Sequence, residues 1–339
     1  MDLQEFLTIV PDLTGLELAV LLSLVAKQHF LVYADEDLVE EVAEELALIT
    51  TEVFELSCSI VGSDDLQSPA RFGEAILDEQ SDLDEGNDLI ATLHSRIENV
   101  SFASGPRGAP AEQKLDSRMV SNVVIAKDFN TACDEVQFQV LELISRNRII
   151  SKTTVHPTPM TFLFIPVVSS ETMRARLNHH LNDRIFMSLY HSAHHGFPNL
   201  EDMIDSYGNM GATTGEEPLV ITKKMIDGLR QRGDAVAVTP EIRRYLQDLI
   251  VFLRVEWDVD GGVTPNAGVN LLDLSKHLAT LHGIDFVTPS LIAIAAKKVY
   301  THRLIISPRA SRGSAAQPVV WRTPEEVIES VIDKVDCPL

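Results

Sequence analysis

Short apolar runs alternate with helical segments along the amino-terminal part of the chain, and this alternation limits the fold more than any other feature. The run HFLVYA, at 29–34, precedes an acidic segment at 35–49 whose leucine, valine and isoleucine side chains recur at helical spacing. Further strands are predicted at 53–60, 123–126, 161–168 and 184–191, a hairpin at 149–159, and further helices at 14–27 and 131–148. Helices between short apolar strands are typical of an α/β protein with a parallel sheet.

The pattern becomes helical from about residue 219, which predicts a second, smaller domain. Two of its helices begin with Thr-Pro, a cap followed by proline at the first helical position. Residues 62–120 are rich in serine, glycine, proline and acids, and they predict a partly mobile, solvated insertion with helical stretches near 70–79 and 88–98. The expected domains are an α/β domain at 1–218, a helical domain at 219–305, and a loop and final helix at 306–339.

Charge and cysteine content restrict the partners and the compartment. The chain of 339 residues has a formal net charge of −22, which argues against nucleic-acid phosphates as partners. Its cysteines, Cys58, Cys133 and Cys337, are widely spaced and indicate a reducing compartment without a disulfide framework or zinc site. We expect no membrane span, because no apolar run is long enough to cross a membrane, and we expect no signal peptide, because the first residues lack a basic region before a long apolar core. We expect a cytoplasmic protein, with a nuclear location also open, whose partner is a protein, either a second copy of this chain or an active subunit of another kind.

The strand VVIA, at 123–126, runs directly into Lys127 and Asp128. The ends of parallel strands are where open α/β sheets bind ligands, so this charged pair is a candidate site. In a nucleotide-hydrolysing protein the pair would be Asp-Glu, with one carboxylate holding magnesium and the other aligning water. Here a lysine stands in the first position, and one magnesium ligand is therefore missing.

The sequence around this strand, AKDFNTACDEVQFQVLELI, resembles the Walker B stretch of the MoxR and magnesium-chelatase I-subunit branch of AAA+ ATPases. LNDRIF, at 181–186, resembles the branch's motif L-x-D-R-F, and GIDFVTPSLIAIAAKKVYTHRL resembles its lid helix. The chain as a whole is similar to the magnesium-chelatase-like AAA+ proteins found in fungi. This resemblance implies a P-loop-NTPase-like parallel sheet with helices on both faces, followed by a small all-helical lid. It also implies that ATP and magnesium are the cofactors of the family.

Four nucleotide-handling elements of that branch are altered here. Where the glycine-rich phosphate loop belongs, the chain reads ADEDLVEEVAEE, which has neither glycine nor lysine. Asp35, Glu36 and Asp37 stand where phosphates would lie, and they would repel an anion. The other altered positions are Lys127 and Asp128 for Walker B, Ser169 or Ser170 for sensor 1, and Asn266 in GVTPNA for sensor 2. We therefore expect no catalytic residue, and neither bound ATP nor bound magnesium.

Two residues each have two interpretations. Arg184 keeps the type of the branch's arginine, which in that family reaches the nucleotide of a neighbouring subunit. It is either such an arginine finger or one half of a surface pair with Asp183. Lys127 is either a stand-in cation that pairs with Asp35 to Asp37 in the phosphate place, or a solvated lysine at the end of a strand.

Histidines are abundant near Arg184, but they do not predict a metal site. His191 and His194 have an i, i+3 spacing, and His179, His180 and His195 lie close in sequence. No cysteine accompanies them, so exposed histidines are expected rather than metal ligands. His302, in THRL, is expected to be a packed residue at a helix end.

These features lead to functional hypotheses of different classes. The first is an AAA+ protein that has lost Walker A and Walker B chemistry and acts as a non-catalytic binding, scaffold or regulatory subunit. The alternative is a subunit of an ATP-dependent assembly that gives Arg184 to an active partner. A third possibility, in which Lys127 holds a phosphate, would need Asp128 as a new magnesium ligand.

Overall fold

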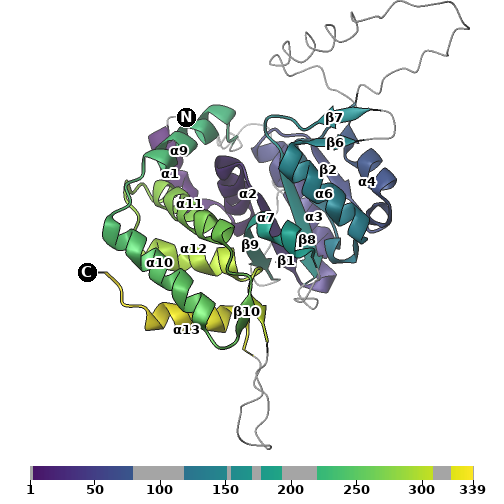
Figure 1. Cartoon of the computed structure of the whole chain (residues 1–339). Helices are drawn as coiled ribbons and strands as arrows, with labels where there is room; N and C mark the ends of the chain where they lie inside the picture. Colours follow the sequence, from purple (N-terminus) through teal and green to yellow (C-terminus); the bar gives the residue numbers. More distant parts are fainter. Residues whose placement is uncertain are drawn as a thin grey trace, which may run out of the picture.

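The computed structural model describes residues 3–78, 118–150, 154–169, 177–192, 220–307 and 322–338. Its centre is a five-stranded parallel sheet in the order β2-β5-β8-β1-β9 (Figure 1). The strands are β1 (His29–Ala34), β2 (Cys58–Val61), β5 (Val123–Ala126), β8 (Leu163–Ser169) and β9 (Ile185–His191). The α/β class and the parallel sheet that the sequence predicts are confirmed.

Side chains of the strands alternate between two buried faces. In β1, Phe30 and Val32 join one apolar core, whereas Leu31 and Tyr33 join the other. The first core includes α2 (Gly15–Ala26) and α3 (Val39–Leu48), and the second includes α4 (Pro69–Ala75), α6 (Asp134–Arg146) and α7 (His179–Arg184). Burial on both faces explains why β1, β5 and β8 are nearly continuous apolar runs in the sequence.

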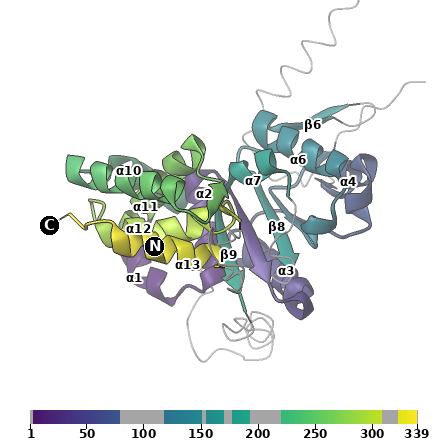
Figure 2. The ribbon, with the colours of Figure 1, turned by 60° about the horizontal axis from the view of Figure 1, so that its bottom comes forward.

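A helical domain packs beside the sheet at β9 (Figure 2). It consists of α9 (Lys223–Ala235), α10 (Pro240–Val255), α11 (Pro265–Leu281), α12 (Pro289–Tyr300), α13 (Pro324–Lys334) and a ribbon of β10 (Val259–Gly261) and β11 (Ile305–Ile306). The amino-terminal helices α1 (Leu3–Ile9) and α2 also contact α9, where Arg230 donates to the carbonyls of Leu24 and Val25 at 2.9 and 2.8 Å. The first core therefore runs continuously from the sheet into the helical domain.

Helices begin where capping residues predict them. Thr14 caps α2 through a reciprocal pair of hydrogen bonds with Glu17. The Thr-Pro starts also act as caps, because Thr239 and Thr288 each accept a backbone N–H from the first turn of α10 and α12. A cap of this kind contributes about 1 kcal/mol, so local signals and tertiary packing favour the same helix boundaries.

Two predicted boundaries are wrong. The strand expected at 53–60 begins only at Cys58, because α3 continues into a wide π-helical turn, Ile49–Val53, with buried apolar side chains. The helix expected at 35–49 begins only at Val39, after a short 3-10 turn, Glu36–Leu38. Apolar residues are buried both in a strand and in the last turn of a helix, so hydrophobicity alone does not tell these two structures apart here.

The ends of the insertion lie side by side. β3 (Leu77–Asp78) pairs antiparallel with β4 (Met119–Val120), and α4 corresponds to the first predicted helical stretch. The predicted hairpin is present as β6 (Arg148–Ile150) and β7 (Val155–Pro157). The helical stretch predicted near 88–98 lies outside the described residues. Within the described ranges, no helix is long and apolar enough to span a lipid bilayer.

Candidate functional site

Three strands end side by side at the carboxyl edge of the sheet. Ala34 of β1 lies opposite Ser169 of β8, and β5 flanks β8 on its other side. Asp35, Lys127 and Ser169 therefore lie along one edge, the place where open α/β sheets bind ligands. The structure thus brings together three of the altered positions that the sequence singles out.

An acidic turn, and not a glycine-rich loop, connects β1 to α3. The amino end of a helix carries a partial positive charge and unpaired N–H groups, which is why it can hold a phosphate. Asp35 accepts a hydrogen bond from the Tyr190 hydroxyl of β9 at 2.8 Å. The carboxylates at the start of this helix are Asp35, Glu36, Asp37, Glu40 and Glu41. The negative charge that a phosphate would supply is already part of the chain.

Lys127 links the end of β5 to the first turn of α3. Its ammonium lies 2.5 Å from Glu40 Oε1, and its side chain is 19% exposed against 62% for Glu40. Its backbone N–H donates to the carbonyl of Val61 in β2 at 2.9 Å. Lys127 is thus a paired cation and not a solvated lysine, but the predicted partner is wrong. The partner is Glu40, which lies beyond Asp35–Asp37, because α3 begins later than the sequence pattern suggests.

Asp128 and Ser169 complete the described edge. Asp128 is left-handed, with φ 50° and ψ 39°, and its carbonyl accepts the backbone N–H and the hydroxyl of Thr131, both at 2.8 Å. Aspartate tolerates this conformation better than most residues, so the turn itself accounts for the residue type. Ser169 is buried at the last position of β8, and Ser170 lies outside the described residues.

The charges along this edge do not suit a triphosphate. A triphosphate beside Asp35, Glu36 and Asp37 would bring like charges together, and that repulsion grows as water is excluded. The charge of Lys127 is already matched by Glu40. Among the residues that the structure describes, no group of three or more His, Cys, Asp or Glu side chains is placed to hold a metal ion. The residues of the edge oppose a bound nucleotide rather than hold it.

Asn266 lies at the opposite, amino edge of the sheet, apart from Lys127 and Ser169. It stands in the first turn of α11, and its amide nitrogen donates to the Asp183 carbonyl at 2.7 Å, just before β9 begins. Asn266 therefore contacts the segment that carries Arg184. The altered positions divide into two groups, one at each end of the sheet.

The helical domain holds Asp183 from two sides. Its carboxylate accepts the Thr264 hydroxyl at 2.5 Å and lies 3.8 Å from Arg303 Nε. Arg184, the next residue, is exposed, and its side chain forms no ion pair or hydrogen bond within the described residues. The Asp183–Arg184 surface pair considered from the sequence is not formed, because Asp183 has its partners in the helical domain.

Arg303 is the buried centre of this contact. Its side chain is 2% exposed, and burial lowers its pKa to about 10, although Asp183 acts in the opposite direction. His302 packs beside it with Nε2 3.3 Å from the Ile185 carbonyl, and burial holds its pKa well below the ordinary value. The guanidinium donates to the carbonyls of Val299 at 2.5 Å, Phe186 at 3.3 Å, Asp183 at 3.3 Å, and Ile185. The prediction of a packed His302 is confirmed, whereas the role of Arg303 was missed, although the His-Arg pair in THRL signals it.

The histidine-rich stretch divides between two elements. His179 and His180 lie in α7 with ring centroids 4.0 Å apart, and His191 is buried at the end of β9. Because His191 is on a strand, the helical meaning of its spacing to His194 does not apply. His194 and His195 lie outside the described residues.

Comparisons with known proteins agree with this architecture. Residues 252–327 match the AAA lid domain, a range that begins in α10 and ends in α13. The crystal structure of a "putative ATPase" from Cytophaga hutchinsonii ATCC 33406 superimposes with a TM-score of 0.60 at 17% identity, over 95% of this chain and 89% of that one. The chain has an AAA+ fold. In this AAA+ fold, the acidic turn follows β1 and Arg184 precedes β9.

Two further proteins are similar to this chain. The uncharacterized protein YeaC of Bacillus subtilis (strain 168) is 21% identical over 205 residues, which are 60% of this chain and 63% of YeaC. The chain thus spans less than two thirds of that relative. A full-length MCM homolog from Methanopyrus kandleri superimposes with a TM-score of 0.47 at 14% identity, over 89% of this chain and 58% of that one.

Proposed function

We propose that this chain is a non-catalytic subunit with an AAA+ fold, which binds another protein and hydrolyses no nucleotide. The observation that carries the proposal is the Lys127–Glu40 ion pair at the acidic start of α3. This pair occupies the two elements that hold magnesium and phosphate in nucleotide hydrolases. By resemblance of its motifs, we place the chain in the MoxR and magnesium-chelatase-like branch, as a member with altered nucleotide motifs.

The acidic turn supports the proposal on energetic grounds. A carboxylate near the amino end of a helix contributes about 0.3 to 1 kcal/mol by interacting with the helix dipole. The acids at the start of α3 stabilise that helix without any ligand, whereas an intact phosphate loop gains this stabilisation from its nucleotide. The proposed function therefore needs neither ATP nor magnesium, and we expect a protein partner, no nucleic acid and a cytoplasmic setting.

Thermal unfolding of the full-length protein with ATP or ADP, each with magnesium, tests the proposal. A ligand at 100 times its Kd stabilises a native protein by about 2.7 kcal/mol. About 1 mM ATP would therefore expose a Kd of about 10 μM as a clear rise of the unfolding midpoint. We expect no rise, and a reproducible rise with ATP-magnesium would overturn the proposal.

A double variant separates the two features that oppose nucleotide. Lys127→Met with Glu40→Gln removes the ion pair and leaves Asp35, Glu36 and Asp37 in place. We expect this variant also to show no rise with ATP. If ATP raised the unfolding midpoint of the double variant but not that of wild type, the ion pair, rather than the acidic turn, would be what prevents nucleotide binding.

A second function is favoured by the state of Arg184. The residue is exposed, and its neighbour Asp183 is fixed by Thr264 and Arg303. A fixed backbone beneath an exposed arginine suits a side chain that reaches another subunit. We propose that Arg184 reaches the nucleotide of an active AAA+ partner, where such arginines contribute about 10³ to 10⁵ in rate in other NTPases.

The test uses an ATPase that co-purifies with the full-length chain. Arg184→Ala should lower ATP turnover of the mixed assembly at least tenfold while the two proteins still co-elute. Arg244→Ala is the matched control, because Arg244 is 86% exposed on α10, and it should leave turnover unchanged. Equal turnover with wild type and Arg184→Ala, in an assembly that has formed, would rule out this second function.

A further inference from the structure

The helix α13 packs against α10 and α12 of the helical domain, as both Figure 1 and Figure 2 show. Its apolar side chains Val327, Ile328 and Val331 are fully buried, Val335 follows them, and all four belong to the first core. Ile328, Val331 and Val335 have the i, i+3, i+7 spacing with which an amphipathic helix anchors itself on a partner surface. The chain thus lays one of its own helices on α10 and α12 as a ligand helix would lie.

One carboxylate of the helical domain holds both ends of α13. Glu256 directly follows α10, and its Oε2 lies 2.7 Å from Nζ of Lys334 in the last turn of α13. Its Oε1 lies 3.5 Å from Arg322, which stands just before the helix and also lies 3.2 Å from Asp258. The apolar face of α13 is therefore bracketed by two cations that meet acids next to α10.

The ion pairs of α13 are open to water. Between its two ends, Glu329 lies 2.7 Å from Lys297 of α12, and both side chains are about half exposed. Lys334 is exposed to a similar extent. Water and salt replace exposed pairs of this kind at little cost, in contrast to the buried contacts of Arg303. The polar contacts of α13 therefore select a matching helix without fixing it permanently.

The way α13 is attached lets it leave without unfolding the helical domain. The backbone N–H of Ser307, just after β11, donates to the Asp258 carbonyl at 3.0 Å, and Arg322 lies against the carboxylate of the same residue. Both ends of the segment 308–321 therefore lie at Asp258. The β10–β11 ribbon keeps its own pairing when α13 is released. An element attached in this way can open locally at a lower free energy than the whole domain.

We propose that the face of α10 and α12 beneath α13 is a docking site for an amphipathic helix of a partner protein, and that α13 is its built-in competitor. The partner helix carries branched apolar side chains at the spacing of Ile328, Val331 and Val335. It has a cation at each end to meet the acids next to α10, and an acid between them to meet Lys297. Because α13 is tethered, its effective concentration is high, and only a well-matched partner replaces it. This inference goes beyond the proposed function and does not rest on it.

A charge reversal on α13 tests the inference and leaves the apolar core untouched. Glu329→Lys with Lys334→Glu places like charges opposite Lys297 and Glu256, and all of the changed side chains are at the surface. A fluorescent peptide of residues 322–338 is titrated into the full-length wild type and into this double variant, and binding is measured by fluorescence polarisation. We expect the peptide to bind the double variant at least tenfold more tightly, because the tethered α13 competes less.

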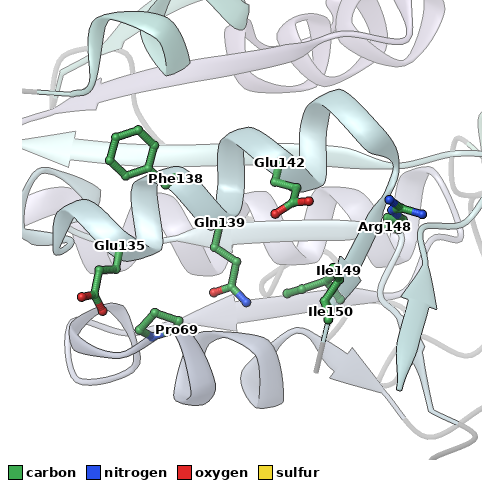
Figure 3. A pocket seen from close by; sticks show the side chains of 8 residues that line it. All are labelled: Pro69, Glu135, Phe138, Gln139, Glu142, Arg148, Ile149 and Ile150. Atoms are coloured by element: carbon green, nitrogen blue, oxygen red, sulfur yellow. The ribbon is translucent and has the colours of Figure 1, made fainter. Parts of the chain in front are cut away.

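Three controls separate docking from nonspecific binding. A peptide with Val331→Asp should not bind the double variant, because its apolar face is interrupted. Adding Lys297→Glu to the double variant restores an opposite charge to position 329 of α13 and should weaken binding of the wild-type peptide at least fivefold. Phe138→Asp changes an exposed residue of α6 that lines a surface hollow between α4, α6 and β6 (Figure 3). This variant should bind the peptide no better than wild type.

Hydrogen exchange of the full-length proteins gives a second readout. The backbone amides of 327–335 should exchange at least fivefold faster in the double variant than in wild type, whereas those of α11 should be unchanged. Equal peptide affinity of the two proteins, binding of the Val331→Asp peptide, or unchanged exchange in α13 would each overturn the proposal. A wild-type dimer that the double variant loses would assign the face to a second copy of the chain and would overturn it too. ATP binding by wild type would overturn the proposed function and leave this result intact.

Discussion

The two ends of the central sheet differ in the burial of their charged side chains. At the carboxyl edge, the Lys127–Glu40 pair is near the surface, with Glu40 62% exposed. At the amino edge, Arg303 is 2% exposed and is surrounded by backbone carbonyls and Asp183. Exposed pairs contribute about 0 to 1 kcal/mol, whereas removal of one buried partner costs about 3 to 5 kcal/mol. The contact with the helical domain should therefore be the rigid end of the sheet, and the carboxyl edge the end that tolerates substitution.

The largest effect expected is the loss of Arg303. Arg303→Met should lower the free energy of unfolding by about 3 to 5 kcal/mol, because Asp183 and several carbonyls lose a buried charged donor. Arg184→Met, at an exposed arginine in the same cluster, should change it by no more than about 0.5 kcal/mol. Urea unfolding midpoints at a common slope give both values. If both variants lowered the free energy of unfolding by a similar amount, the buried Arg303 and the exposed Arg184 would not differ in their contribution to stability.

The second largest effect is expected from acid, which should lower the free energy of unfolding through His29 at the amino edge. His29, at the start of β1, accepts the Phe164 N–H at 3.0 Å, and burial lowers its pKa from 6.5 to about 4. The unfolded chain then binds more protons than the folded chain between these pH values, so stability is lost as pH falls from 6.5 towards 4. At pH 5 the loss from His29 is about 2 kcal/mol.

The check is a comparison of unfolding free energies at pH 7 and pH 5 for wild type and His29→Asn. Asparagine can keep an acceptor for the Phe164 N–H but does not titrate, so the variant should lose less stability on acidification. Buried His302 has its pKa lowered by burial and by Arg303 and adds to the same trend in both proteins. Parallel pH profiles for wild type and variant would show that His29 does not set this sensitivity.

The fold was more predictable than the site, for a physical reason. β5 and β8 are nearly continuous apolar runs because both faces of the sheet are buried there, and such runs are visible in the sequence. The partner of Lys127 depends on where α3 begins, and the acidic run from Asp35 to Glu41 offers several equivalent carboxylates. The contact between Asn266 and Asp183 depends on how the helical domain packs, which neither segment encodes alone.

A smaller effect is expected where the helical domain meets the Arg184 segment through Asn266. Asn266→Ala removes the 2.7 Å hydrogen bond to the Asp183 carbonyl and should cost about 1 kcal/mol of unfolding free energy. Val269→Ala, at a residue 57% exposed on the same helix, is the control and should cost less. Asn266→Arg, which introduces the arginine of the family's sensor-2 motif, should still give no midpoint rise with ATP, because position 266 lies at the opposite end of the sheet from Lys127. A rise would contradict the separation of the two groups.

The smallest effect is expected at the carboxyl edge. Lys127→Met should cost about 0.5 to 1 kcal/mol at low salt, since Glu40 remains well solvated when its partner is removed. About 1 M NaCl shortens the screening length to about 3 Å, so the difference from wild type should shrink there. A double-mutant cycle with Glu40→Gln isolates the coupling between the two side chains. A coupling above about 2 kcal/mol, unchanged by salt, would mean that this edge is as rigid as the Arg303 contact. The acidic turn would then be a packed part of the sheet edge rather than a solvated one.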